Sequence, residues 1–217
     1  MHCKMLVMRV TAKPVLLLLS VASLLAGCSS NQPSPAPESQ AKKNSEQITG
    51  RAAFQKLYVT ARGWASDAQP FVLESGVTKD APGHDGKAAI WRAGFASLGR
   101  RMQERFQWSG AVGPDAPEAG VSHGTEDSYS ATNSSTQVFD TSRIQIDSDA
   151  AFDVAQKHGG DKLLKAKADT PVTYRLQWDP RKSELYWRVA YGRSSDNPDL
   201  AVDVNATQPG DFLRVEK

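Results

Sequence analysis

The stretch PVTYRLQWDPRKSELYWRVAYG, residues 171–192, contains two runs in which apolar and polar residues alternate. The large apolar positions are Val172, Tyr174, Leu176 and Trp178 in the first run, and Leu185, Trp187, Val189 and Tyr191 in the second. This alternation is typical of strands that bury one face. Because Asp179-Pro180-Arg181-Lys182 between the runs is typical of a turn, the stretch predicts an antiparallel hairpin.

The residues on either side of this hairpin predict a helix packed on an antiparallel sheet. Asp147 offers an N-cap for a helix that stops at Gly159-Gly160, and residues 161–169 add another turn or two. Two further strands are predicted at 200–206 and 211–217. A helix with one apolar stripe must bury it, and the apolar face of the sheet provides the matching surface.

A similar order of elements comes earlier in the chain. A helix is predicted over residues 50–65, with Thr49 as its N-cap. Strands are predicted at 70–75, 87–97 and 100–110, the last two joined by a turn at Leu98-Gly99-Arg100. The predicted fold class is therefore α+β, with two tandem helix-on-antiparallel-sheet units at residues 49–140 and 141–217.

Residues 110–140 are polar and rich in Gly, Ser, Asn and Asp, which predicts a linker or a long surface loop. Tyr129 and Phe139 are expected to pin it to the folded parts. The repeated order of elements suggests a duplication, although convergence on so common an arrangement is the alternative.

Residues 1–27 have the three parts of a secretory signal. Lys4, Arg9 and Lys13 give the positive region, VLLLLSVASLL gives the apolar region, and small residues follow. The apolar run of about ten residues is too short for the ~20 that a spanning helix needs. Residues 28–48 contain almost no large apolar residue, which predicts a flexible tether.

Leu25-Ala26-Gly27-Cys28 resembles the lipobox of bacterial lipoproteins. That resemblance implies a diacylglyceryl group on the sulfur of Cys28, cleavage before this residue, and acylation of the new amino terminus. Several acyl chains would hold the protein stably on a membrane. Ser29 stands where the family carries an Asp for inner-membrane retention, so the resemblance favours the outer membrane, facing the periplasm. An ordinary cleaved signal with an incidental cysteine is the alternative.

The C-terminal unit, residues 141–217, resembles the PepSY and PepSY-like domains. The resemblance is carried by PVTYRLQWD, WRVAY and VDVNATQPG, the last at residues 202–210. The family's closing signature is V-x-V-D-A-x-T-G; here Asn205 replaces the usual Asp, and Gln208-Pro209 is inserted before the glycine. The resemblance implies a helix across a curved antiparallel sheet, a PepSY-like or cystatin-like fold. It also implies inhibition or regulation of peptidases, or ligand sensing in the envelope.

The charge balance argues against a nucleic-acid partner. Removal of the signal leaves 23 Lys+Arg and 24 Asp+Glu, so the net charge of the mature chain is 23 − 24 = −1. Nucleic-acid binding requires clustered cations, and this balance offers few. Cys3 is removed with the signal, so the mature chain has no disulfide and no unmodified thiol for catalysis.

Residues that could carry chemistry are few. The mature chain has His84, His123 and His158, each in a glycine-rich or helix-end setting. His123 with Glu126 and Asp127 could form a hydrolase or metal site in the 110–140 loop, but a second His at helical or hairpin spacing is missing. No nucleotide-binding or hydrolase motif occurs. The prediction is therefore no catalytic residue, no metal and no cofactor.

Three aromatic residues, Trp178, Trp187 and Tyr191, form a candidate binding surface if they face outward, and part of the core if they face inward. Trp178 and Trp187 could pair across the hairpin. We therefore expect a non-catalytic module that binds an unknown envelope protein or peptide, for example a peptidase inhibitor or modulator, and its exposed sheet edges could add a strand. The alternatives are a hydrolase or metal-binding enzyme that uses residues 110–140, and a structural envelope scaffold.

Overall fold

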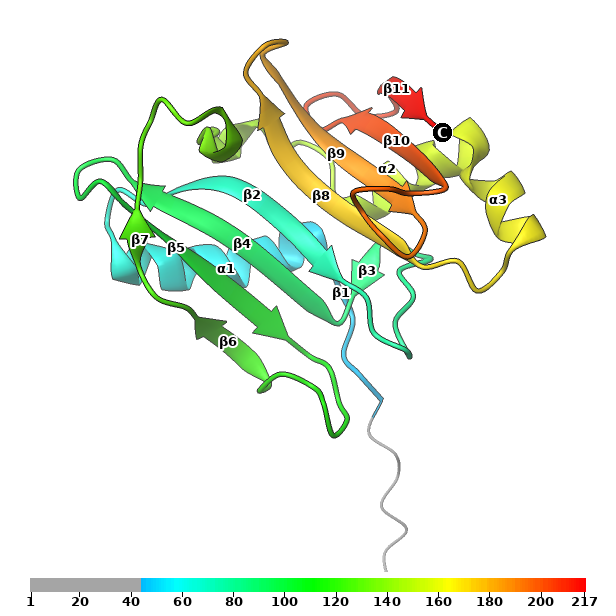
Figure 1. Ribbon diagram of the computed structural model, residues 1–217, viewed down its shortest axis with the longest axis horizontal. Coiled ribbons are helices and arrows are strands. Elements are labelled where there is room, and N and C mark those ends of the chain that lie inside the picture. The colour runs from blue at the N-terminus through cyan, green and yellow to red at the C-terminus, as the bar shows by residue number, and fades with distance from the viewer. Residues whose placement is uncertain (1–43) are drawn as a thin grey trace, which may run out of the picture. The chain divides into compact units, whose positions relative to one another are not determined.

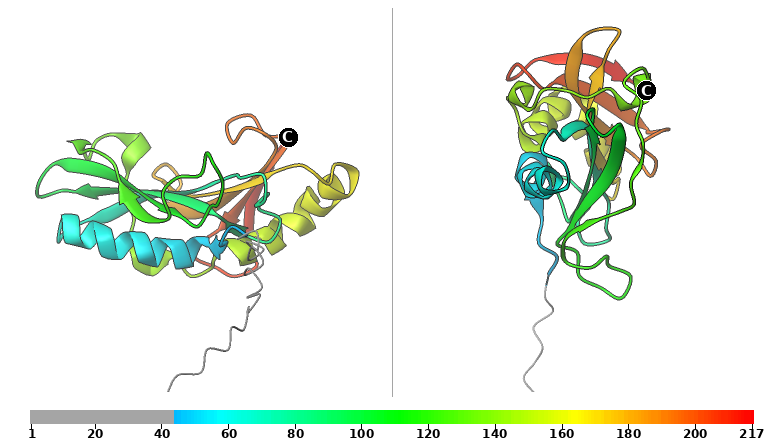
Figure 2. Two further views of the ribbon diagram at one scale, coloured as in Figure 1. Left: turned by 90° about the horizontal axis from the view of Figure 1, so that it is seen from below. Right: turned by 90° about the vertical axis from the view of Figure 1, so that its left-hand side faces the viewer.

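The computed structural model describes residues 44–217 and shows one large antiparallel sheet with helices against one of its faces (Figures 1 and 2). The α+β class is therefore confirmed. The predicted signal, the lipobox with Cys28 and most of the predicted tether lie outside the described residues.

The sheet has nine strands in the order β11-β10-β9-β8-β2-β4-β5-β6, and β7 pairs with β5 beside β6. Every pairing in it is antiparallel. The strands are β2 Gln69–Gly76, β4 Ile90–Ser97, β5 Met102–Ser109, β6 Gly120–His123, β7 Asp127–Ser128, β8 Val172–Asp179, β9 Glu184–Tyr191, β10 Leu200–Asn205 and β11 Phe212–Glu216.

The strands of the two expected units join edge to edge. β2 is the first long strand of the earlier half and β8 the first strand of the later half, and they pair with Leu73 opposite Leu176. Each half then continues away from this seam, through β4 and β5 on one side and β9, β10 and β11 on the other. The described residues therefore form a single compact unit with one shared sheet.

The helices begin where the sequence predicts. α1, Gly50–Trp64, is capped by Thr49, whose side chain accepts a hydrogen bond from Ala52 N–H. α2, Ser148–Ala155, is capped by Asp147. The predicted stop at Gly159-Gly160 is instead a kink: Gly159 has φ 115°, and α3, Asp161–Ala166, continues beyond it. A glycine is suited to this left-handed conformation because it has no Cβ.

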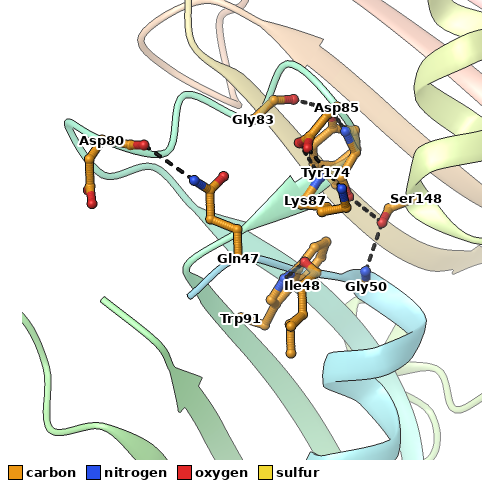
Figure 3. A network of polar contacts seen from close by, with 11 residues as sticks. Gln47, Ile48, Gly50, Asp80, Gly83, Asp85, Lys87, Trp91, Ser148 and Tyr174 are labelled. Carbon is orange, nitrogen blue, oxygen red and sulfur yellow. Dashed lines mark hydrogen bonds and ion pairs between the residues drawn. The ribbon is translucent and has the colours of Figure 1, made fainter. Parts of the chain in front are cut away.

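The N-termini of α1 and α2 meet at the seam between the halves. Gly50 N–H donates to Ser148 Oγ at 2.7 Å, and Arg51 N–H donates to Asp147 Oδ1 at 2.8 Å. Figure 3 shows Gly50 and Ser148 in this position. Helix N-termini carry partial positive charge, so the carboxylate of Asp147 between them offsets their mutual repulsion.

A short two-stranded ladder lies beside this junction and corrects the predicted end of the tether. β1, Ile48–Thr49, pairs with β3, Lys87–Ala88. Trp91 Nε1 donates to the carbonyl of Ile48 at 2.9 Å (Figure 3). The folded part therefore includes residues that the sequence assigned to the tether, because Ile48 packs against the core.

Residues 77–87 are tied to the same region by Tyr174. Its hydroxyl accepts from Gly86 N–H at 3.1 Å and donates to the carbonyl of Gly83 (Figure 3). Ser148 Oγ donates to the carbonyl of Gly86 at 2.5 Å. Burial raises the pKa of the Tyr174 phenol, so its proton remains available as a donor.

The 110–140 segment is more structured than predicted. It supplies the short strands β6 and β7 and a 3₁₀ turn, η1, Ser134–Thr136. Tyr129 and Phe139 pin it as expected, with exposed fractions of 7% and 4%. η1 lies on the sheet face that the helices leave uncovered (Figure 2).

Candidate binding surface

The candidate aromatic surface does not form. Trp187 and Tyr191 are both 0% exposed, because alternation along β9 directs them toward the helices. The Tyr191 hydroxyl accepts from Gln156 Nε2 at 2.9 Å, and burial raises the pKa of this phenol. These two residues belong to the core and offer nothing to a partner.

Trp178 is partly exposed and does not pair with Trp187. In the hairpin register Trp178 lies opposite Leu185, whereas Trp187 lies opposite Leu176. The Arg143 guanidinium lies 5.2 Å from the centre of the Trp178 ring, a cation–π distance. Trp178 is thus the one member of the predicted surface that a ligand could contact.

The predicted enzyme residues are also separated. His123 Nδ1 lies 2.6 Å from Oε1 of Glu104, a β5 carboxylate that is 4% exposed. Glu126 instead accepts from the Trp64 indole at 2.6 Å and pairs with Arg100. These hydrogen bonds lower the pKa of the Glu126 carboxyl.

The Asp127 carboxylate accepts from Ser128 N–H at 2.7 Å and from Gln103 Nε2 at 3.5 Å, and it forms no hydrogen bond with His123 or Glu126. Between residues 44 and 217 no group of three or more His, Cys, Asp or Glu side chains could hold a metal ion. The other histidines make structural contacts. His84 Nε2 lies 2.7 Å from the carbonyl of Thr170, and His158 stacks on Phe212.

The sheet face away from the helices carries a row of polar side chains that crosses seven strands. Residues directly opposite each other in neighbouring strands project from the same face. We call these residues the polar row: Gln107 on β5, Arg92 on β4, Glu74 on β2, Arg175 on β8, Arg188 on β9, Asp203 on β10 and Arg214 on β11.

Most members of the polar row are paired with a neighbour. Arg92 Nε donates to Gln107 at 2.8 Å. At the other end, buried Asp203 accepts from Arg188 at 3.3 Å and pairs with Arg214 Nε at 2.6 Å. These contacts compensate the cost of burying a carboxylate, because two guanidinium groups face it.

The exception is the centre of the polar row, where Arg175 lies directly opposite Arg188. Like charges at opposite positions in a sheet repel each other. The ion pair between Arg175 and Glu74 is long, at 3.9 Å, and Glu74 also pairs with Arg105 at 3.3 Å. Arg175 Nε is buried and has no hydrogen-bond partner among the described residues.

Two hollows open beside Arg175 on the uncovered face. The first, of about 450 Å³, lies between η1 and the tip of the β8–β9 hairpin. The second, of about 260 Å³, lies beneath the segment between β9 and β10. Arg175 and Gln177 line both, so the hollows adjoin along β8. Trp178 lines the first hollow and Arg188 the second.

Such an arrangement can bind an elongated polar ligand. The donors include guanidinium, amide and hydroxyl groups, the last from Ser134 and Ser135 in the first hollow and Ser195 in the second. The sequence carries one signal for this site, because Arg175 and Arg188 occupy the polar positions of the two alternating runs.

None of the helices between residues 44 and 217 is long and apolar enough to span a lipid bilayer. Comparison with known proteins returned no matching family model, no matching curated protein and no matching solved structure.

Proposed function

We propose that this chain is a non-catalytic cell-envelope lipoprotein that binds an extended protein or peptide segment on the uncovered face of its sheet. The observation that carries the binding role is the polar row, whose central Arg175 is incompletely paired beside two adjoining hollows. A surface that serves only stability would pair the buried Nε–H of Arg175, because unpaired buried polar groups are costly.

The proposed location rests on the amino-terminal sequence. The resemblance of Leu25-Ala26-Gly27-Cys28 to a lipobox supports acylation of Cys28, and Ser29 supports the outer membrane. Radioactive palmitate should label the full-length chain, and the Cys28→Ala variant should lose both the label and its membrane association. Membrane association of the variant at the original level would contradict the proposed anchor.

We also propose that each half is a PepSY-like unit. This rests on the sequence resemblance of residues 141–217 and on the order of helix followed by antiparallel strands in both halves. A peptide-binding regulator of envelope peptidases is the role that this resemblance favours. The two halves would then place their uncovered faces side by side as one broad surface.

Photo-crosslinking tests the proposed surface. A photoreactive residue replaces Arg105, which is exposed on the uncovered face, or Val59, which is 74% exposed on α1. We expect partner adducts in the intact envelope from position 105 and none from position 59. Adducts from position 59 alone, or from neither position, would overturn the proposed surface.

The enzyme alternative makes a different prediction about His123. If residues 110–140 supplied a catalytic site, His123→Ala would abolish function. In the proposed binding role, this substitution leaves the adducts from position 105 unchanged. Loss of the adducts in a folded His123→Ala protein would contradict the binding role.

A further inference from the structure

Resting on the proposed function, we infer that the bound segment carries an acidic side chain whose carboxylate binds between Arg175 and Arg188. Both guanidinium groups line the smaller hollow, and the rest of its lining is Thr173, Gln177, Ala190, Ser195 and Asp196. The site is defined here by Arg175, Arg188 and Gln177.

The first argument is the charge pattern across the sheet. The polar row contains four arginines and two carboxylates, and its one adjacent like-charged pair is Arg175 and Arg188. The carboxylates of Asp203 and Glu216 pair with Arg188 from the far side. Arg175 has no ion pair as close as these. A carboxylate bound here would therefore offset the repulsion between the two guanidinium groups and form an ion pair with Arg175.

The second argument is the shape of the free donor group. Nε and one Nη of a guanidinium form a planar fork that matches the two oxygens of a carboxylate. In Arg175, Nε has no partner among residues 44–217, and Nη1 has only the 3.9 Å pair with Glu74. Charge-assisted hydrogen bonds of this bidentate kind are about twice as strong as neutral ones.

The third argument is the form of the space. Two adjoining hollows of about 260 and 450 Å³ follow β8 on either side of Arg175, which suits an extended segment and not a compact ion. Phe71 lines the far hollow, where it can contact an apolar side chain of the same segment. We therefore expect an acidic residue to be accompanied by a neighbouring apolar residue.

The test uses the full-length protein in detergent and a fluorescein-labelled ten-residue peptide with central glutamates next to a leucine. A matched peptide has glutamine in place of each glutamate. We expect fluorescence anisotropy to show saturable binding of the acidic peptide and at least about tenfold weaker binding of the glutamine peptide. Equal affinities would overturn the inference.

Two substitutions localise the binding. Arg175→Gln should lower the affinity for the acidic peptide by about tenfold or more. Arg193→Gln replaces an exposed arginine outside both hollows and should leave this affinity unchanged. Arg175→Lys keeps the charge but loses the planar fork, so an intermediate affinity is expected. Equal affinities in all three variants would place the anion elsewhere and overturn the inference.

Two further outcomes separate the possible failures. If inorganic phosphate alone displaces the acidic peptide completely and also protects the protein thermally in an Arg175-dependent way, the site binds a phosphate and the inference fails. If the acidic peptide does not bind while position 105 still forms partner adducts, the carboxylate site fails and the proposed function stands. If position 105 forms no adducts, the proposed function fails as well.

Discussion

Trp91 and Trp187 meet edge to face across the seam of the sheet, with ring centres 6.3 Å apart and an interplanar angle of 77°. Each indole also holds the start of a helix. Trp91 Nε1 donates to the carbonyl of Ile48 at 2.9 Å, and Trp187 Nε1 donates to that of Ile146 at 3.2 Å. Each isoleucine directly precedes the N-cap of its helix. The two halves thus fix their helices by the same device.

Substitution of either tryptophan should therefore destabilise the fold. Trp91→Phe or Trp187→Phe leaves a carbonyl without its donor, and we expect the free energy of unfolding to fall by about 1–3 kcal/mol in each case. Because the rings touch, the effect of the double variant should differ from the sum. Urea denaturation measures all three values.

The control for this comparison is Trp64→Phe. The Trp64 indole donates to Glu126 on the protein surface, where water can replace the lost partner. Trp64→Phe should lower the free energy of unfolding clearly less than Trp91→Phe or Trp187→Phe does. Equal losses of stability in all three variants would show that the indole hydrogen bonds at the helix starts contribute no more than the one at the surface.

Gly50 allows the two tryptophans to approach the start of α1. A Cβ at this position would lie 2.5 Å from Cη2 of Trp187 and 3.0 Å from Cη2 of Trp91. We expect Gly50→Ala to lower the free energy of unfolding by about 1–3 kcal/mol, as overpacking of a core does. Thermal unfolding followed by circular dichroism would measure it.

Gly63, in the same helix, is the matched control. A Cβ there has no other atom within 4 Å, so Gly63→Ala should stabilise the protein by about 0.5–1 kcal/mol through helix propensity. The two substitutions are chemically identical and should have opposite signs. Stabilisation by both would mean that the tryptophans move aside without cost.

Glu104 and His123 form a pair that joins the edge strand β6 to β5. Glu104 is buried, and His123 Nδ1 is its partner at 2.6 Å. His123→Ala leaves this carboxyl group buried without that partner, so we expect a loss of about 1–3 kcal/mol in stability. Adding Glu104→Leu to His123→Ala should recover much of the loss. A double variant less stable than His123→Ala alone would contradict this account.

The Asp67 carboxylate should stabilise the fold at neutral pH, and this stabilisation should be lost in acid. Its carboxylate accepts from the Ser97 hydroxyl at 2.6 Å and from Gly99 N–H at 2.8 Å. These bonds, Ser97 first, hold the pKa of Asp67 below its ordinary value of 3.8. A pKa lowered by folding stabilises the fold above the unfolded value, and this contribution is lost as the pH falls through the folded value.

Asp67→Asn should therefore lower the free energy of unfolding more at neutral pH than at a pH below the folded-state pKa. Carboxyl titration by NMR should also show the pKa of Asp67 rising toward 3.8 in the Ser97→Ala variant, which lacks the main donor. An unchanged titration in that variant would assign the lowered pKa to another cause.

Local patterns predicted the elements of this fold well where the physical cause is itself local. The N-caps at Thr49 and Asp147 are side-chain to backbone contacts within a few residues, and each is present. Prediction was weaker in residues 110–140, where the polar composition indicated a loop and the structure contains β6 and β7. Those strands pair with an edge that exists only once β5 is in place, so their formation depends on tertiary contacts.

The sequence by itself determined which residues of each strand share a face, because alternation directs successive side chains to opposite faces. It therefore implied that Arg175 and Arg188 project from the face opposite to the large apolar residues of their strands. Only the tertiary structure decided that Glu74 lies beside Arg175, since the pairing of β2 with β8 joins residues about a hundred positions apart. The alternation within a strand indicates which side chains share a face, but it does not indicate which strand lies beside it. The neighbouring strand decides whether a charged side chain on the surface is paired or is free to bind a ligand.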